Sequence, residues 1–242
     1  MRWGALSIVV MSLVSSRIEA ACLDPATLAP SIVNITRAFG EAERKAEVGV
    51  LGIGGTGWFL APQLMVTAAH VAEAMHLSTG SWTEIEVRER DRKAVVAVQI
   101  LDTVGASAEK LAVLELKDAF PGAIALPVRT EPLVRGEPLV SLAYPDRQLR
   151  TASGRFVQLG SDDRTAGAAL LEMYDGNDRL VLDHGASGAP VIDCSGRVVA
   201  VVVNLMTRNI NFFSNVMRVS TPWDSPNVAS VPVQSLKNYV PH

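Results

Sequence analysis

Two residues that stand far apart in this sequence, Ser187 and His70, are of types that can do covalent chemistry together. Ser187 lies in a turn of small residues, 185–190 (GASGAP), and His70 ends the segment 67–70 (TAAH). A serine hydroxyl is a weak nucleophile until a base, most often a histidine, takes its proton. The small neighbours on both segments leave room for the two side chains to meet. These residues therefore predict a nucleophilic serine with a histidine as its general base.

Each of the two residues also has an ordinary structural explanation. A turn of this composition is usually only a turn, and a histidine at a strand end is often a polar cap held by a backbone carbonyl. His76 lies on a segment expected to be exposed, and His184 is too close to Ser187 in sequence to fold back onto it, so neither is a better base. An α/β-hydrolase needs its histidine after the serine, where only His242 occurs. The pairing of His70 with Ser187 thus depends on a fold that brings them together.

The bulk composition is that of a folded protein rich in strands. The chain has 242 residues, of which 48% are hydrophobic and 19% charged, which is enough to bury the core of one domain or two small subdomains. The formal net charge is -3 with a pI near 5.8, and lysines and arginines are scattered without a basic stripe. This charge distribution does not favour nucleic acid as a partner.

The first twenty residues, 1–20, have the three parts of a signal peptide. A positive start at Arg2 precedes an apolar stretch over 5–14 and a more polar exit that ends in small residues at Ala20 and Ala21. The apolar stretch is too short to span a bilayer comfortably, and no other segment approaches the length of a transmembrane helix. We therefore expect cleavage after Ala20 or Ala21 and export of the mature chain, either to a periplasm or as a secreted protein.

The two cysteines, Cys22 and Cys194, both lie in the expected mature region. In an oxidising compartment an even pair favours one disulfide. Lipidation of Cys22 is the alternative, although the preceding residues 19–21 (EAA) place an acid where such a signal has an aliphatic residue. Two unpaired thiols would be the remaining state.

Short apolar segments separated by glycines, prolines and polar residues predict many short strands and few helices. A glycine-rich segment, 48–60, and a second segment, 64–67, form a hairpin that leads to His70. Four prolines within 118–138 indicate a connector between two halves. Helices are expected only within 26–44, over 71–75 and after a strand end at 231–233. The other expected strands are 85–88, 95–101, 111–116, 139–143, 154–159, 168–173, 180–182, 189–192 and 198–204.

Five blocks of sequence occur in the order found in one large family of peptidases. They are 55–60 (GTGWFL), 66–71 (VTAAHV), 111–116 (LAVLEL), 185–191 (GASGAPV) and 196–199 (GRVV). Together they resemble the chymotrypsin-like (trypsin-like) serine peptidases, and the short-loop bacterial branch with the Deg/HtrA-type protease domains looks nearest. The ending at 231–237 is similar to the last strand and helix of that branch.

The resemblance implies an all-β fold of two perpendicular six-stranded antiparallel β-barrels with a short C-terminal helix. The peptidase domain would cover 21–242, with the N-terminal barrel at about 45–120, the connector at about 118–138 and the C-terminal barrel at about 139–235. In the cleft between the barrels, Ser187 is the implied nucleophile, His70 the general base, and the N–H groups of Gly185 and Ser187 the oxyanion hole. The implied reaction is hydrolysis of peptide bonds in a protein or peptide substrate through an acyl-enzyme, with no metal and no cofactor.

The chain departs from the family pattern just before the segment 111–116. The family has an aspartate there that orients the histidine, whereas this chain has Lys110, whose charge would oppose protonation of His70. The adjacent Glu109 could replace the aspartate after a shift of one residue, and Asp102 is a more distant candidate. If no carboxylate supports His70, the alternative function is that of a catalytically impaired homologue that acts by binding a protein.

The resemblance also implies a specificity pocket. Val181 would lie at its base, and its wall would run from Val202 to Asn204, which favours a small or hydrophobic side chain before the cleaved bond. A shift of two positions in the alignment would instead bring Asp183 or Asp178 to the base.

Overall fold

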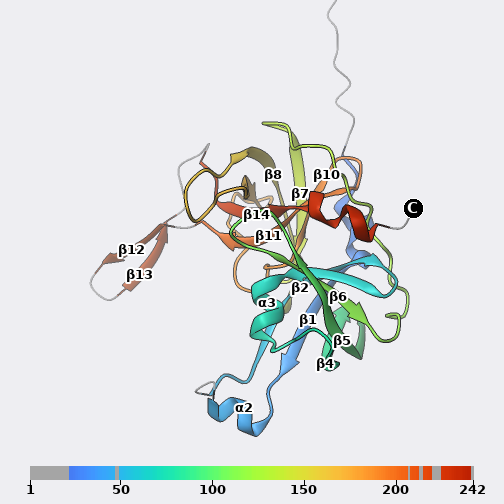
Figure 1. The fold of residues 1–242 in the computed structure, drawn as a ribbon. Helices are drawn as coiled ribbons and strands as arrows, with labels where there is room; N and C mark the ends of the chain where they lie inside the picture. Colours follow the sequence, from blue (N-terminus) through green and yellow to red (C-terminus); the bar gives the residue numbers. More distant parts are fainter. Residues whose placement is uncertain (1–21, 47–48, 207, 213–214, 220–224, 241–242) are drawn as a thin grey trace, which may run out of the picture.

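The computed structural model describes residues 22–46, 49–206, 208–212, 215–219 and 225–240. Within them the chain folds into two closed antiparallel β-barrels of six strands each, with few and short helices (Figure 1). The expected all-β fold of two six-stranded barrels is therefore confirmed. The expected signal peptide at 1–20 lies outside the described residues. None of the helices in the described ranges has the length and apolar composition needed to cross a membrane.

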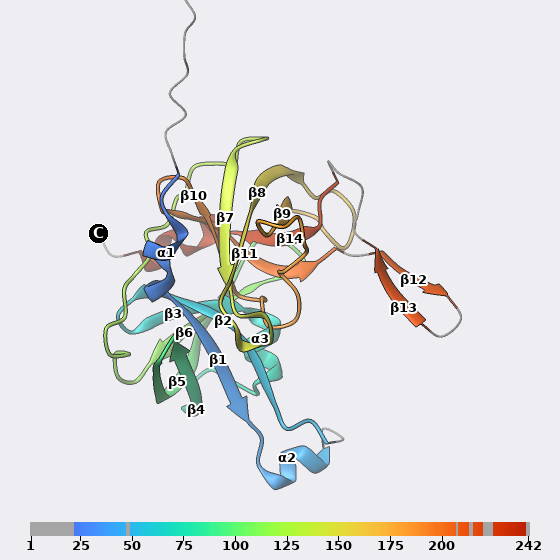
Figure 2. The same cartoon turned by 180° about the vertical axis from the view of Figure 1, so that it is seen from behind.

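The first barrel has the strand order β1-β2-β3-β6-β5-β4. Strands β2 and β3 form the glycine-rich hairpin, and β3 runs directly into the short helix α3 (Ala69–Ala74), which carries His70. Helix α2 (Glu41–Ala46), between β1 and β2, projects from one end of the molecule (Figure 2). The strands are β1 (Ile32–Ala38), β2 (Gly52–Ala61), β3 (Leu64–Ala68), β4 (Thr83–Glu89), β5 (Arg92–Val104) and β6 (Leu111–Leu116).

The second barrel has the strand order β10-β11-β14-β9-β8-β7, and the turn with Ser187 leads into β10. A short 3-10 helix, Val233–Tyr239, follows the last strand, as expected. Strands β12 (Arg208–Phe212) and β13 (Asn215–Val219) form a separate hairpin that stands away from both barrels (Figures 1 and 2). The barrel strands are β7 (Pro138–Ala143), β8 (Arg150–Leu159), β9 (Ala169–Tyr174), β10 (Pro190–Asp193), β11 (Val198–Leu205) and β14 (Val228–Pro232). The remaining short helices are α1 (Pro25–Leu28) and the 3-10 turns Ala29–Ser31 and Pro145–Arg147.

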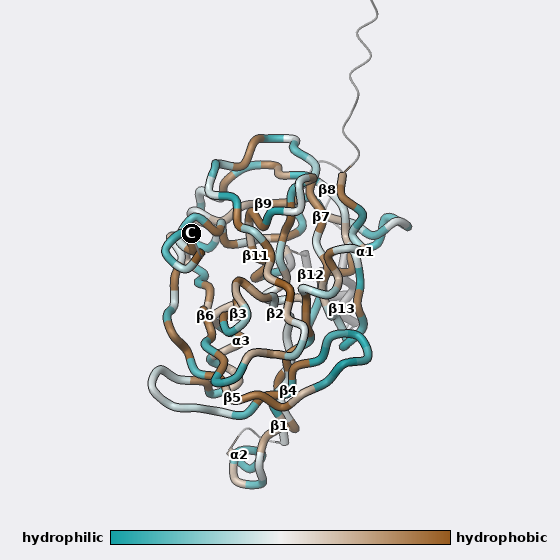
Figure 3. The backbone as a smooth tube through the Cα atoms, turned by 90° about the vertical axis from the view of Figure 1, so that its right-hand side faces the viewer, coloured by the Kyte–Doolittle hydropathy of each residue, from teal (hydrophilic) through white to brown (hydrophobic). Residues whose placement is uncertain are grey.

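Apolar side chains fill both barrels and the contact between them. Hydrophobic segments gather along the strands in the middle of the molecule, and hydrophilic segments gather on peripheral loops (Figure 3). Trp58 and Leu114 are fully buried in the first barrel, and Leu171 is fully buried in the second. Val201 and Val231, on strands of the second barrel, pack in the same cluster as the first-barrel core. The two barrels therefore share an apolar contact that holds the segments with His70 and Ser187 in one body.

The structure differs from the sequence-based expectations at three places. The segment 26–44 holds short helices as expected, in α1 and the first residues of α2, but it also contains strand β1, which was not expected. Ile32, Val33 and Ile35 are buried in β1, and β1 closes the barrel between β2 and β4. The first barrel therefore begins before the expected boundary near residue 45. No strand forms at 180–182, where Leu182 enters the second core from a loop. The β12–β13 hairpin was not indicated by the sequence pattern.

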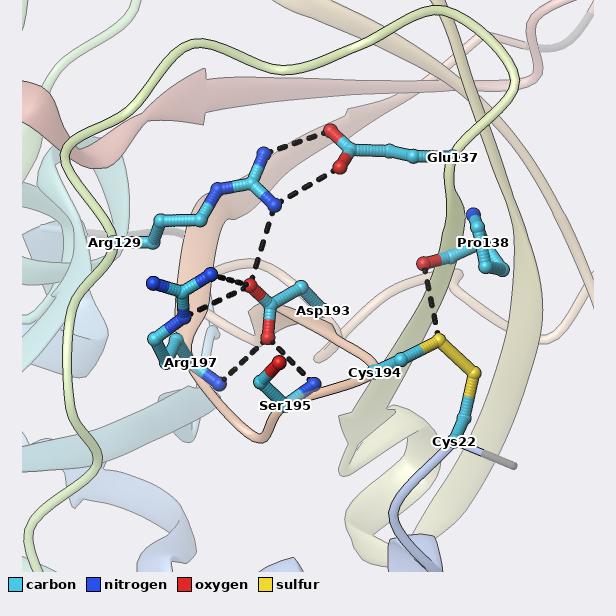
Figure 4. The surroundings of a disulfide bond; sticks show 8 residues. All are labelled: Cys22, Arg129, Glu137, Pro138, Asp193, Cys194, Ser195 and Arg197. Atoms are coloured by element: carbon cyan, nitrogen blue, oxygen red, sulfur yellow. Dashed lines mark hydrogen bonds and ion pairs between the residues drawn. A yellow bond between two sulfur atoms is a disulfide. The ribbon is translucent and has the colours of Figure 1, made fainter. Parts of the chain in front are cut away.

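A disulfide joins Cys22 to Cys194 at the outer side of the second barrel (Figure 4). Cys194 follows strand β10, and Cys22 precedes helix α1, so the bond ties the start of the described chain to the second barrel. The pairing favoured from the sequence is thus present.

A buried ionic cluster next to the disulfide holds the connector against the second barrel (Figure 4). Arg129 of the connector donates to Glu137 at 2.8 and 2.9 Å and to Asp193 at 3.2 Å. Asp193 also accepts from the backbone N–H groups of Ser195 and Arg197. Burial opposes ionisation of Asp193, but these N–H groups and the Arg197 guanidinium outweigh it and lower the pKa of this carboxyl.

We predict that Asp193→Asn lowers the free energy of unfolding at pH 7 by about 3 kcal/mol, because it leaves the buried Arg129 without one of its two carboxylate partners. Since the pKa of Asp193 is lowered on folding, its carboxylate stabilises the fold above about pH 4 and loses that effect as the pH falls further. The difference from the wild type should therefore shrink at pH 3 in urea unfolding. The exposed Asp118→Asn is the matched control, and an equal effect of both substitutions at pH 7 would contradict the prediction.

Candidate active site

His70 is held where the first barrel faces the second. Strand β3 ends at Ala68 and helix α3 begins at Ala69, so His70 lies in the first helical turn. The Ala69 N–H donates to the carbonyl of Lys110 at 2.9 Å, which fixes this turn to the start of strand β6. The imidazole is thereby placed beside the loop that joins β5 to β6.

Glu109, in that loop, lies against His70. Its Oε2 is 3.5 Å from His70 Nδ1. The side chains of His70 and Glu109 are 42% and 46% exposed, respectively. The Ser107 hydroxyl donates to the Glu109 carbonyl at 2.6 Å and stiffens the loop. A carboxylate thus faces the imidazole nitrogen that the family's aspartate would face, although water reaches both groups.

The two other charged candidates from this region have different partners. Lys110 Nζ donates to the Gly105 carbonyl at 2.5 Å, within its own loop. Asp102 accepts a short hydrogen bond from the hydroxyl of Tyr239 in the C-terminal 3-10 helix. Of Glu109 and Asp102, the structure therefore brings only Glu109 to His70.

The turn with Ser187 is hydrogen-bonded to strand β2 of the first barrel. The Thr56 N–H donates to the Ser187 carbonyl at 2.9 Å, and Thr56 Oγ1 donates to the Gly185 carbonyl at 2.7 Å. Within the turn, the Ala189 N–H donates to the Ala186 carbonyl at 2.9 Å. The carbonyls of residues 185, 186 and 187 therefore all accept hydrogen bonds from the protein itself.

Two N–H groups of the turn remain for a ligand. The N–H groups of Ala186 and Gly188 are already used, since they donate to the carbonyls of Asp183 and Val202, respectively, both at 2.8 Å. Those of Gly185 and Ser187 donate to no acceptor within the described ranges. Such a pair of N–H groups beside a serine can bind the negative oxygen of a tetrahedral intermediate.

The Ser187 hydroxyl donates to the Val203 carbonyl at 3.5 Å, and no hydrogen bond to His70 exists in the described part of the chain. A bond of this length is weak. Catalytic hydrogen bonds are often long or absent without substrate and tighten when it binds. The hydroxyl is therefore only lightly held in its present orientation.

The three residues expected to form a specificity pocket lie in different surroundings. Val181 is partly buried and borders a cavity of about 390 Å³, together with charged side chains that include Asp183 and Arg179. Val202 is buried in the core of the second barrel, and Asn204 is exposed on strand β11. Of the three, only Val181 borders this cavity.

No cluster of three metal-ligating side chains occurs among the residues that the structure covers. Sequence reasoning did not identify Thr56 as part of the site. The block 55–60 contained it, but its contacts with residues more than a hundred positions away have no local sequence signal.

Comparisons with known proteins agree with the two-barrel fold. The family model of the trypsin-like peptidase domain matches residues 55–201. No curated protein matches the chain. The active form of the Rv3671c protease from M. tuberculosis superimposes with a TM-score of 0.58 at 18% identity, covering 88% of this chain and 81% of that chain. Its inactive form gives a TM-score of 0.55 at 19% identity and covers 88% of each chain. At this identity the structures share the fold.

We predict that Gly188→Ala disrupts the docking of the turn. Gly188 has φ +92°, and a Cβ there would overlap the Thr56 carbonyl oxygen and the Thr67 hydroxyl. The free energy of unfolding should fall by more than about 2 kcal/mol, measured by urea denaturation. Gly176→Ala is the control, because a Cβ at Gly176 meets nothing within 4 Å. A loss as small as that of the control would show that the close approach is not needed.

Proposed function

The chain belongs to the trypsin-like peptidase domain family, and we propose that it is a serine endopeptidase that cleaves protein or peptide substrates through an acyl-enzyme on Ser187. The observation that carries this proposal is the arrangement of the turn at 185–188. The carbonyls of residues 185, 186 and 187 accept hydrogen bonds from the protein, and the N–H groups of Gly185 and Ser187 are left to bind an oxyanion.

In the first half of the reaction, His70 Nε2 takes the hydroxyl proton as Ser187 Oγ bonds to the substrate carbonyl carbon. Nδ1 faces Glu109, so Nε2 is the nitrogen available to the serine. The N–H groups of Gly185 and Ser187 hold the negative oxygen. The C–N bond then breaks as His70 returns the proton to the leaving amine. In the second half, His70 deprotonates a water that attacks the ester carbonyl carbon, and it returns the proton to Ser187 Oγ as the C–O bond breaks and the acid leaves.

Glu109 is proposed as the third member of this group. Its carboxylate beside Nδ1 stabilises the imidazolium that forms when His70 accepts the proton. Because both side chains are nearly half exposed, water screens this attraction more than it would for a buried aspartate. We therefore assign Glu109 a smaller contribution than the family's aspartate makes.

We further propose that the protein acts outside the cytoplasm, either in a periplasm or as a secreted protein. The signal-peptide pattern at 1–20 supports export. The disulfide between Cys22 and Cys194 supports an oxidising compartment.

A fluorophosphonate, which labels only activated serines, tests the nucleophile. We expect the mature chain to be labelled, Ser187→Ala to remain unlabelled, and His70→Ala to be labelled at least about 10³-fold more slowly, since it lacks the base. Mass spectrometry of the intact chain measures the rates. If the parent is labelled no faster than Ser187→Ala, the peptidase proposal is wrong. The alternative of a homologue that acts by binding a protein, based on Lys110 at the family's aspartate position, would then be the one to test.

We predict that Glu109→Gln slows this labelling by about 10- to 100-fold, because the amide cannot balance the charge of the imidazolium. Glu73→Gln removes the same charge from the exposed face of helix α3 and is the matched control. Both variants should unfold at the same urea concentration as the parent to within the error of the measurement. Equal labelling rates for the two variants would exclude Glu109 as the carboxylate that supports His70.

A further inference from the structure

Thr56 is a fully buried residue of strand β2, and its hydroxyl bonds to two segments of the other barrel. Oγ1 accepts a hydrogen bond from the Tyr144 N–H at 2.9 Å. It donates its one proton to the Gly185 carbonyl at 2.7 Å. Because the Tyr144 N–H can only donate, the hydroxyl proton has a single direction, toward Gly185.

The backbone of Thr56 joins the same turn to the segment that leads to His70. Its N–H donates to the Ser187 carbonyl at 2.9 Å, and its carbonyl accepts from the Thr67 hydroxyl at 2.8 Å. Thr67 lies in strand β3, three positions before His70. One residue is therefore bonded both to the serine turn and to the strand that carries the histidine.

Gly185 is a position where the turn needs such support. It has φ +92° and no side chain, so its own backbone allows several peptide orientations. The peptide between Gly185 and Ala186 is fixed at both ends: Thr56 Oγ1 binds its carbonyl, and its N–H donates to the Asp183 carbonyl at 2.8 Å. Without the hydroxyl, the carbonyl would lose its partner in a buried place, where an unpaired acceptor is costly.

We propose that the Thr56 hydroxyl is a positioning group for the oxyanion hole: by holding the Gly185 carbonyl, it keeps the N–H groups of Gly185 and Ser187 pointing at one spot. The inference rests on the proposed peptidase function. Thr56 touches no substrate atom and acts through the turn. Its backbone bond to Ser187 survives any side-chain substitution, so the hydroxyl can be tested separately.

Thr56→Val keeps the shape of the side chain and removes the hydroxyl, whereas Thr56→Ser keeps the hydroxyl and removes the methyl group. We expect Thr56→Val to be labelled by the fluorophosphonate at least 10-fold more slowly than the parent, and Thr56→Ser to stay within about threefold. Should Thr56→Val fail to fold, Thr56→Ala replaces it, because the Ala and Ser variants differ only in the hydroxyl. Equal slowing in the variants with and without the hydroxyl would overturn the proposal.

Asn227→Ala controls for a general loss of stability. Asn227 is fully buried in the second barrel, and its side chain bonds both backbone groups of Met173, at 2.9 and 3.0 Å, outside the turn. Its removal should lower the urea midpoint but leave the labelling rate of the folded protein unchanged. If Asn227→Ala slows labelling as much as Thr56→Val does, the role of Thr56 is only structural and the proposal is wrong.

Hydrogen exchange of the segment 183–189 separates this proposal from the proposed function, because it needs no catalysis. We expect at least 10-fold faster exchange in Thr56→Val and no change in Thr56→Ser or Asn227→Ala. If the parent is not labelled at all, the peptidase function fails, and the exchange result alone decides whether Thr56 holds the turn. Unchanged exchange in Thr56→Val would overturn the inference even in a protein that is labelled.

Discussion

The site depends on the docking of one turn of the second barrel onto one strand of the first. The two backbones approach so closely that Gly188 has no room for a side chain, because a Cβ there would overlap the Thr56 carbonyl. A Cβ on Gly55 would overlap the Val71 side chain and come into tight contact with the Ser187 carbonyl. Two hydrogen bonds from Thr56 close this contact. Because β2 pairs with β3, and β3 leads into the helix with His70, the same contact sets the serine relative to the histidine.

Two neighbouring residues, Glu109 and Lys110, contact the segment with His70 in different ways: Lys110 through its backbone and Glu109 through its side chain. The Lys110 backbone carbonyl accepts a hydrogen bond from the Ala69 N–H at the start of the helix that carries His70. The Lys110 side chain turns to the Gly105 carbonyl, and the carboxylate near His70 comes from the preceding residue, Glu109. Strand β6 thus pairs with β3 in an unbroken register, and the carboxylate near His70 comes from the loop before β6, where water reaches it.

Tyr144 extends the contact between the barrels beyond the turn itself. Its N–H is bound by Thr56, and its hydroxyl accepts from the Arg90 N–H at 3.2 Å, so the first barrel holds both ends of the residue. Burial raises the pKa of this phenol, which stays neutral and able to take part in these bonds. On the far side of the second barrel, Arg129 and Asp193 hold the connector in place. The turn with Ser187 therefore belongs to a barrel that is itself held by contacts with the first barrel and with the connector.

Sequence alone determined the architecture and the two reactive residue types, because alternating apolar segments and ordered motif blocks are local signals. It placed His70 and Ser187 on their segments and indicated Glu109 as one of two carboxylates that could approach the histidine. Strand β1 was not predicted, since Ile32–Ala38 becomes a strand only through pairing with β2 and β4. The choice of Glu109 over Asp102, the partner of Lys110 and the contacts of Thr56 were decided by the tertiary structure. They depend on which loops and barrels come into contact, and such long-range contacts leave no periodic pattern in the chain.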